Sequence, residues 1–275
     1  MNLMKNSLRN IKVSFIGGGK MTTSMVNNLI ANKLLLPKQI TISDHNKSKN
    51  EYFRSKWNIH TINDNYNACK NSDVVILAVK PQAIDKVFNN LENLSDKLIC
   101  SVIAGVTLNT YQTKLKSNVK FVRIMPNTPC IIGEGMSVWC SNQLELDDIN
   151  VVKSILQSFG KEMYVDDEKY LDIATAVSGT GPTYLYLLAE SMIDSGVHLG
   201  LSREKTKEIV YQTILGSIQY TINSNVHPAI LRNDITSPGG TSAEALYILE
   251  KNGFRGIISD AIWAAYNKSK QLGLK

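Results

Sequence analysis

One segment near the start of the chain constrains the fold more than any other: a short apolar strand, a glycine turn and a helix. Residues 12–16 have the strand pattern, and three glycines follow at once at 17–19. Apolar residues then recur at helical spacing over 25–30. The glycines permit a tight bend and let the backbone approach a pyrophosphate, which the helix N-terminus then faces. The segment predicts a dinucleotide-binding unit, although Thr22 stands where the simple pattern has a third glycine.

Several later runs extend this pattern into a mainly parallel sheet. The runs at 73–79, 98–103 and 119–125 are almost continuously apolar, as expected for strands buried on both faces. Turn residues follow each run, and ligands bind beyond the carboxyl ends of strands in such sheets. We also expect a strand at 40–43, an antiparallel edge strand near 136–140, a helix near 149–159 and a short strand at 162–165.

Two charged residues lie at this ligand-binding edge. Asp44 follows the strand at 40–43, about 20 residues beyond the glycine turn, where an acid can accept hydrogen bonds from an adenosine 2′-hydroxyl. Taken alone, Asp44 favours NAD over NADP, but an ordinary turn aspartate explains it equally well, and His45 and Lys47 could hold a 2′-phosphate. Lys80 follows the strand at 73–79 and places a cation at the same edge, although a surface lysine is the simpler interpretation.

The second part of the chain reads as helices. Strong strand runs end before Asp167, so we divide the chain into a dinucleotide-binding domain at 1–167 and a helical domain at 168–275. Pro182 suits the first turn of one helix, and Ser202 suits the cap of the next. These helices carry apolar stripes, which fit either a domain core or contact with a second subunit.

A glycine-rich turn at 236–241 introduces another helix. Thr241 stands three residues before Glu244, which is the spacing of a capping box, so we expect Thr241 to cap a helix that stops near Gly253. The first N–H groups of a helix have no internal partner and carry positive potential, which suits a carboxylate or phosphate. For this segment alone, a capped turn without a ligand is the simpler interpretation.

Composition argues against several classes of function. The net charge is +6, but the lysines are scattered and no dense basic tract indicates a nucleic-acid site. The 4 cysteines lack zinc-site spacing, so we expect no metal centre and reduced core thiols, such as Cys100 and Cys140, in a reducing compartment. Residues 1–10 lack the apolar core of a secretory signal, and no apolar run is long enough to span a membrane. We therefore expect a cytoplasmic protein, with an organelle as the alternative.

Six short motifs occur along the chain in a fixed order. They are Ile16-Gly17-Gly18-Gly19-Lys20-Met21, Leu77-Ala78-Val79-Lys80-Pro81, Ala104-Gly105-Val106-Thr107, Asn127-Thr128-Pro129, Ser178-Gly179-Thr180-Gly181-Pro182-Thr183-Tyr184 and Ser237-Pro238-Gly239-Gly240-Thr241-Ser242. With this set the chain resembles the pyrroline-5-carboxylate reductase family over nearly its whole length. The resemblance implies an N-terminal Rossmann domain and a C-terminal all-α domain that forms a homodimer, with larger rings built from dimers. It implies reduction of 1-pyrroline-5-carboxylate to L-proline, the last step of proline biosynthesis, with NADPH or alternatively NADH.

The resemblance also implies which residues bind each ligand. Its cofactor-binding residues are Ile16, Gly17, Gly18, Gly19, Lys20, Met21, Asp44, Asn65, Ala78, Val79, Lys80, Pro81, Ala104 and Gly105. Its substrate-binding residues are Asp234, Ser237, Gly240, Thr241 and Ser242, and its catalytic residues are Ser242 and Lys80. The position of Ser242 is usually threonine in the family, and serine keeps the hydroxyl.

We expect the helix start to hold the substrate by its acid group. The substrate carboxylate would accept hydrogen bonds from backbone N–H groups at 240–242, and the Ser242 hydroxyl would face the imine nitrogen. A serine hydroxyl is too weak an acid to act as a proton reservoir at neutral pH, so it would orient the imine or relay a proton from water.

Two other functions fit the first domain. A Rossmann dehydrogenase acting on a 3-hydroxy acid would need a lysine or histidine base in the second domain, and Lys205, Lys207, His198 and His227 lie in no such motif. A dinucleotide-binding regulator without catalysis would need no substrate pocket, which the intact turn at 237–242 argues against.

Overall fold

The computed structural model describes residues 7–88, 94, 97–115 and 119–273, and these form two compact units. The first unit comprises the chain up to Thr180 together with the segment from Ala265 onward, and the second is Gly181–Ala264. The domain boundary that we placed after Asp167 stays a prediction. Residues 1–6, part of the segment predicted not to be a secretory signal, lie outside the described residues.

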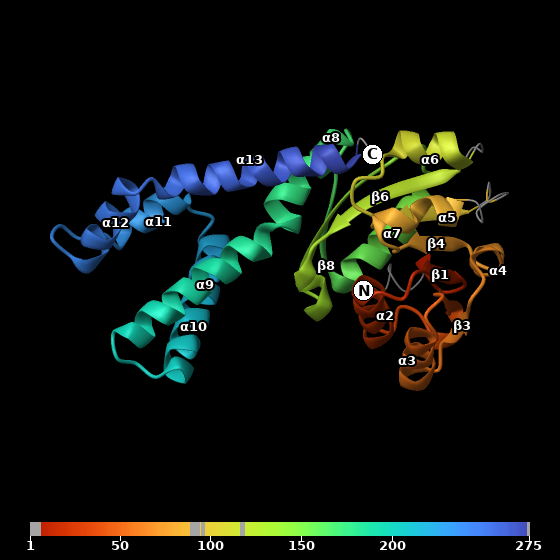
Figure 1. The fold of residues 1–275 in the computed structure, drawn as a ribbon, viewed down its shortest axis with the longest axis horizontal. Coiled ribbons are helices and arrows are strands. Elements are labelled where there is room, and N and C mark those ends of the chain that lie inside the picture. The colour runs from red at the N-terminus through yellow and green to blue at the C-terminus, as the bar shows by residue number, and fades with distance from the viewer. Residues whose placement is uncertain (1–6, 89–93, 95–96, 116–118, 274–275) are drawn as a thin grey trace. The chain divides into compact units, whose positions relative to one another are not determined.

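Within the described residues, the first unit is built on one eight-stranded sheet (Figure 1). Neighbouring strands are parallel except for β6 and β7. Strand β1 lies between β2 and β4, at the point where the strand order reverses, which is where ligands bind in open parallel sheets. In spatial order the strands are β3 (His60–Ile62), β2 (Ile40–Ser43), β1 (Val13–Ile16), β4 (Val74–Leu77), β5 (Leu98–Ser101), β6 (Lys120–Pro126), β7 (Gly135–Ser141) and β8 (Gly160–Tyr164).

The strand predicted near 136–140 forms as β7 and is antiparallel to β6, but its predicted place at the sheet edge is wrong. Strand β8 pairs in parallel beyond β7, with Gly160 opposite Gly135. A parallel neighbour needs a crossover connection, and helix α7 (Leu146–Leu156) supplies it. Gly160 has a φ of +148°, which a side chain rarely permits, and it turns the chain directly into β8.

Helices connect the strands, and the polar segment 47–70 contains two helices and a strand that the sequence did not lead us to expect. Helix α3 (Lys47–Trp57) buries Asn50 and Phe53 alone among its residues, so it shows no apolar stripe. Its start is specified by Asn46, whose side chain accepts hydrogen bonds from the next turn. The other helices of this unit include α2 (Lys20–Ala31), α4 (Asn65–Lys70), α5 (Ile84–Phe88), α6 (Leu108–Leu115), α7 and α8 (Lys169–Ala174), with short helical segments η1 (Pro37–Gln39), η2 (Pro81–Ala83), η3 (Thr128–Ile132), η4 (Gln157–Phe159) and η5 (Thr175–Gly179).

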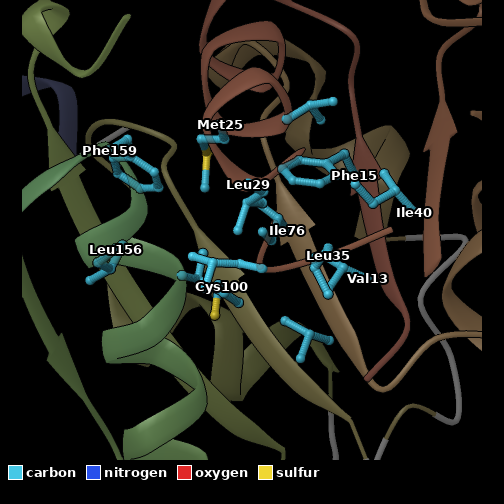
Figure 2. Close-up of a cluster of buried hydrophobic side chains, with 14 of the residues drawn as sticks. Val13, Phe15, Met25, Leu29, Leu35, Ile40, Ile76, Cys100, Leu156 and Phe159 are labelled. Carbon is cyan, nitrogen blue, oxygen red and sulfur yellow. The ribbon is translucent and has the colours of Figure 1, made fainter. Parts of the chain in front are cut away.

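Alternate residues of the central strands supply two apolar clusters, one on each face of the sheet. Phe15, Ile76 and Cys100 belong to one cluster, together with residues of α2 and α7 (Figure 2). Val75 and Ile99 belong to the other. The continuous apolar runs in the sequence therefore reflect strands that are covered on both sides.

The cysteines are buried thiols, as predicted. Cys69, Cys100, Cys130 and Cys140 are all free of disulfides and buried. Burial raises the pKa of Cys69, Cys100 and Cys140 to about 12 each. Because the thiolate is the reactive form, these side chains are inert core residues at neutral pH.

The second unit is helical, and together the two units confirm the predicted fold class. Its helices are α9 (Gly181–His198), α10 (Arg203–Ser224), α11 (Pro228–Asp234), α12 (Thr241–Lys251) and the first part of α13 (Phe254–Gly273). Ser202 caps α10 as predicted, since its side chain accepts a hydrogen bond from the Lys205 N–H. Large apolar side chains on α9 and α10 are exposed to solvent; Leu187 and Ile222 are examples, and both are 63% exposed. Among the described residues, no helix is long and apolar enough to cross a bilayer.

The turn at 237–240 leads into α12 as predicted, but the predicted capping box is wrong. Gly240 is the N-cap, and Thr241 is the first helical residue. The Gly240 carbonyl accepts hydrogen bonds from the N–H groups of Ala243 and Glu244, so the helix begins one residue earlier than expected. Gly239, with a φ of +69°, makes the tight bend that brings Gly240 into this position.

Candidate active site

The glycine turn lies at the carboxyl end of β1, between β2 and β4. The Gly17 N–H donates to the Ser43 carbonyl at 2.8 Å, and the Ala78 N–H donates to the Ile16 carbonyl at 2.9 Å. Gly17 has a φ of +104°, and a Cβ there would lie 2.7 Å from the Ala78 oxygen, so no side chain fits. Gly19 is the N-cap of α2, and a Cβ there would meet no atom within 4 Å. The turn is thus closed toward the sheet and open toward the start of α2, which is the geometry of an anion site.

Thr22 explains how this turn works without the third glycine. Its side chain is fully buried, and its hydroxyl donates to the Gly17 carbonyl at 2.5 Å. The departure from the simple pattern therefore holds the turn together. Lys20 and Met21 are the first two residues of α2, Lys20 exposed and Met21 half-buried.

Asp44 is 6% exposed, and its carboxylate is engaged by the protein itself. One oxygen accepts the Gly18 N–H at 2.7 Å and the Lys49 ammonium at 3.0 Å, and the other accepts the Asn46 N–H at 2.8 Å. Burial alone would raise the pKa of Asp44, but the hydrogen bonds from Asn46, Gly18 and Lys49 outweigh it and hold the pKa below its usual value. Asp44 therefore ties the glycine turn to the start of α3, and its contact with a ribose stays a prediction.

A groove of about 650 Å³ opens beside the glycine turn and is lined by residues of α2 and α3. Lysine side chains from both helices give it a positive character. From the sequence, Gly18, Gly19 and Lys20 were named for the cofactor, but Asn46, Ser48 and Lys49 were missed. The two residues offered for a 2′-phosphate, His45 and Lys47, are not among those that line this groove. The N-cap residue Asn46, which marks the start of α3, was the available signal. The lining includes Gly18, Gly19, Lys20, Asn27, Asn46, Ser48, Lys49, Tyr52, Lys56 and Ile131.

The predicted nicotinamide-side residues follow β4 and β5 at the same edge of the sheet. Residues 78–81 continue from β4, with Lys80 exposed just before η2. Ala104 and Gly105 follow β5, and Gly105 has a φ of +78°. Because β1, β4 and β5 are parallel neighbours, the structure brings these two segments and the glycine turn to one edge, as predicted.

Asn65 lies next to the end of β2. It is the first residue of α4, and its side-chain oxygen accepts a hydrogen bond from the Ser43 hydroxyl at 2.7 Å. Ser43 directly precedes Asp44, so Asn65 lies beside the position that sequence reasoning assigned to a ribose.

The predicted substrate residues gather around the start of α12 in the second unit. Thr241 and Ser242 open the helix, so their N–H groups have no partner within it. A Cβ at Gly240 would lie 2.5 Å from the Ser237 hydroxyl oxygen, so a side chain there would force the Ser237 hydroxyl to move. Asp234 is the exposed last residue of α11, three positions before Ser237. The turn therefore presents two free amides and hydroxyl groups, which suits a carboxylate.

Two family models match the chain, one in each part of the sequence. Residues 168–272 match the family model described as pyrroline-5-carboxylate reductase dimerisation, and residues 12–105 match the one described as NADP oxidoreductase, coenzyme F420-dependent.

Similar proteins extend over the whole chain. The pyrroline-5-carboxylate reductase of Synechocystis is 36% identical over 96% of this chain and 99% of its own length. That of Arabidopsis thaliana is 34% identical over 99% of each. A solved structure of Plasmodium falciparum pyrroline carboxylate reductase with NADP bound has a TM-score of 0.89 and 35% identity, over 97% of this chain and 99% of its own.

Proposed function

The chain belongs to the pyrroline-5-carboxylate reductase family, and from this we infer that it reduces 1-pyrroline-5-carboxylate to L-proline with NADPH. This is the last step of proline biosynthesis. The observation that carries the inference is the 36% identity over 96% of the chain, which includes both units. The open cradle at Gly19, which a Cβ would partly fill, fits the dinucleotide independently.

In this reaction the protein contributes mainly by binding and orienting the substrate and the cofactor. When bound, NADPH would be the source of the hydride that the ring carbon of the C=N bond needs, and the protonated nitrogen would receive the π electron pair of that bond. No side chain can supply a hydride. The residues of this chain must therefore hold the imine close to the cofactor, control its orientation and handle one proton.

We assign the pyrophosphate to the open face of the glycine turn, at the N-terminus of α2. Lys49 and Ser48, with the Asn46 side chain, line the groove beside it and suit the 2′-phosphate that distinguishes NADPH. Lys49 is held in place by Asp44, since its ammonium lies 3.0 Å from the carboxylate. In this arrangement Asp44 serves the cofactor by fixing Gly18 and Lys49.

Residues 78–81 and the pair Ala104 and Gly105 are assigned to the nicotinamide half, because they continue along the same sheet edge. Lys80 is exposed there, and its ammonium would attract and orient the anionic ligands. This gives Lys80 a part in both cofactor binding and catalysis.

We assign the substrate carboxylate to the N–H groups of Thr241 and Ser242, aided by the dipole of α12. The Ser242 hydroxyl faces the imine nitrogen, orients it and relays a proton from water. Residues 1–167 accordingly form the cofactor domain, and residues 168–275 form the substrate and dimerisation domain.

The exposed apolar side chains of the second unit point to a homodimer. Few of its aliphatic residues are buried, and Ile193 and Val210 are two of them. A monomer would leave the other apolar faces in water, which is unusual for a soluble protein. We propose that a second copy covers these faces, that dimers assemble further, and that the reduced thiols place the protein in the cytoplasm.

The decisive assay follows NADPH absorbance with 1-pyrroline-5-carboxylate and identifies the product. We expect stoichiometric formation of L-proline. If the purified protein does not oxidise NADPH with this imine, the proposed function is wrong.

Ser242→Ala tests the catalytic assignment. Loss of the hydroxyl should lower kcat by about 100-fold, the range of a positioned proton-transfer group, with an unchanged melting temperature. Ser195→Ala, which removes an exposed hydroxyl from α9 in the same unit, is the matched control. Unchanged turnover in Ser242→Ala would remove Ser242 from the chemistry.

A further inference from the structure

Arg123 is a buried cation that the reaction described above does not use. It lies on β6 and is 5% exposed. Its guanidinium donates to the Glu168 carboxylate at 2.7 Å and lies 3.9 Å from the Asp172 carboxylate. Glu168 is the N-cap of α8 and Asp172 lies one turn further on, so a single side chain fastens α8 to the sheet. A buried charge persists only when it is paired in this way.

The two carboxylates each reach one more element. The Glu168 oxygen that meets Arg123 also accepts the N–H of Leu108 at 2.9 Å, and Leu108 is the first residue of α6. Asp172 accepts the Ser269 hydroxyl at 2.6 Å, and Ser269 is buried near the end of α13. Figure 1 shows α8 beside this end of α13. Four elements are thus joined through Arg123.

Two of these four elements meet at the turn of residues 104–107. Helix α6 begins immediately after this turn, at Leu108, whose N–H is held by Glu168. From the other side, Gly105 lies against the end of α13: a Cβ there would lie 3.0 Å from the Leu272 carbonyl carbon and oxygen. Leu272 is three residues past Ser269. The backbone of the turn is therefore fixed on both sides by contacts that lead back to Arg123.

We propose that Arg123 and Glu168 are positioning residues for the nicotinamide half of the cofactor site, with Ser269 in a supporting part. Neither side chain touches a ligand in this arrangement. They set the position of the turn at 104–107, and the turn, when correctly positioned, contacts the cofactor. The inference rests on the proposed assignment of Ala104 and Gly105 to NADPH.

The test separates positioning from stability by comparing KM with kcat. Glu168→Gln and Arg123→Met should raise KM and Kd for NADPH by about 10-fold, in the range by which residues remote from a ligand change its affinity. Ser269→Ala should raise both by about 3-fold, because it removes only the α13 contact. Arg123→Lys keeps the charge near Glu168 and should recover part of the affinity. At saturating NADPH, kcat should stay within about 3-fold of wild type.

Lys120→Met is the matched control. Lys120 lies on the same strand and pairs with Asp148 at 2.7 Å, but that pair leads to no ligand-binding turn. Its KM and Kd for NADPH should equal those of wild type.

A purely structural role gives a different result. It would lower the folded fraction, and hence apparent kcat and melting temperature, while KM for NADPH in the remaining folded molecules stays unchanged. That outcome in Glu168→Gln and Ser269→Ala overturns the proposal, and these two variants decide it even if Arg123→Met does not fold. Because Kd for NADPH is measured without an imine, the proposal is judged separately from the assay for proline formation.

Discussion

Gly17 and Gly19 are two positions apart in one turn, but the structure gives them separate tasks. Gly17 has a φ of +104° and lies against Ala78, so Gly17→Ala forces both backbone strain and a clash. We expect it to lower the unfolding free energy by about 3 kcal/mol. Gly19 has a φ of −84° and open space around it, so Gly19→Ala should fold as wild type. It should still weaken NADPH binding by at least about 10-fold, because its methyl group occupies the pyrophosphate site.

Urea unfolding and NADPH titration of both variants check this pair. If Gly19→Ala binds NADPH as tightly as wild type, the dinucleotide does not lie over the turn as proposed.

Asp44 makes the stability of this region depend on pH. Its pKa is lowered in the folded protein, so its stabilising effect is complete above the unfolded value, near 4, and is lost as pH falls through the folded value. Asp44→Asn removes a charged acceptor from Gly18 and Lys49 and should lower the unfolding free energy by about 2 kcal/mol at pH 7. The difference between wild type and variant should shrink toward zero below about pH 4. A difference that is constant with pH, measured by urea unfolding, would contradict the role given to the ionised carboxylate.

At the scale of elements, we expect helix α3 to set the preference between NADPH and NADH. Lys49 lines the groove beside the glycine turn, and its side chain is 43% exposed. Lys49→Met should raise KM for NADPH by about 10-fold and leave KM for NADH within about 2-fold, since only NADPH has the 2′-phosphate. Lys70→Met is the control, because Lys70 is the exposed last residue of α4 and is not among the residues that line this groove. An unchanged NADPH to NADH ratio in Lys49→Met would refute this placement.

The elements that could be predicted well from the sequence are those in which burial requires an apolar or small residue at every position. Strands β4 and β5 are covered on both faces, so every position in them is apolar or small and the pattern needs no context. Helix α3 escaped prediction because it buries only one large apolar residue, Phe53. The place of β7 inside the sheet depends on pairing with β8, which residue type does not specify.

In the site, too, some features could be predicted from the sequence and others could not. The glycine turn was predictable because its conformation requires glycine at Gly17. The partners of Asp44 were not, because the same acid at the same spacing can face a ribose or a backbone amide. At α12, a capping-box pattern was present, but the bend at Gly239 moved the helix start to Gly240.

At the scale of the whole molecule, the second unit should be stable only in a dimer. Light scattering on the purified protein should give a mass of about twice the 30.5 kDa of the chain, or a larger even multiple. Leu187→Asp places a charge on an exposed apolar helix and should weaken dimerisation by at least about 100-fold. Leu146→Asp, at a position 72% exposed in the first unit, should leave the mass unchanged. A wild-type monomer at micromolar concentration would rule out this use of the exposed faces.

The most direct measurement is a crystal structure of the protein with NADP⁺ and L-proline bound together. We predict that the proline carboxylate accepts hydrogen bonds from the N–H groups at 240–242, with the ring nitrogen facing the Ser242 hydroxyl. We also predict that the pyrophosphate of NADP⁺ lies over Gly19. Proline bound away from residues 237–242 would contradict the central claim, even if the protein turned over the imine in solution.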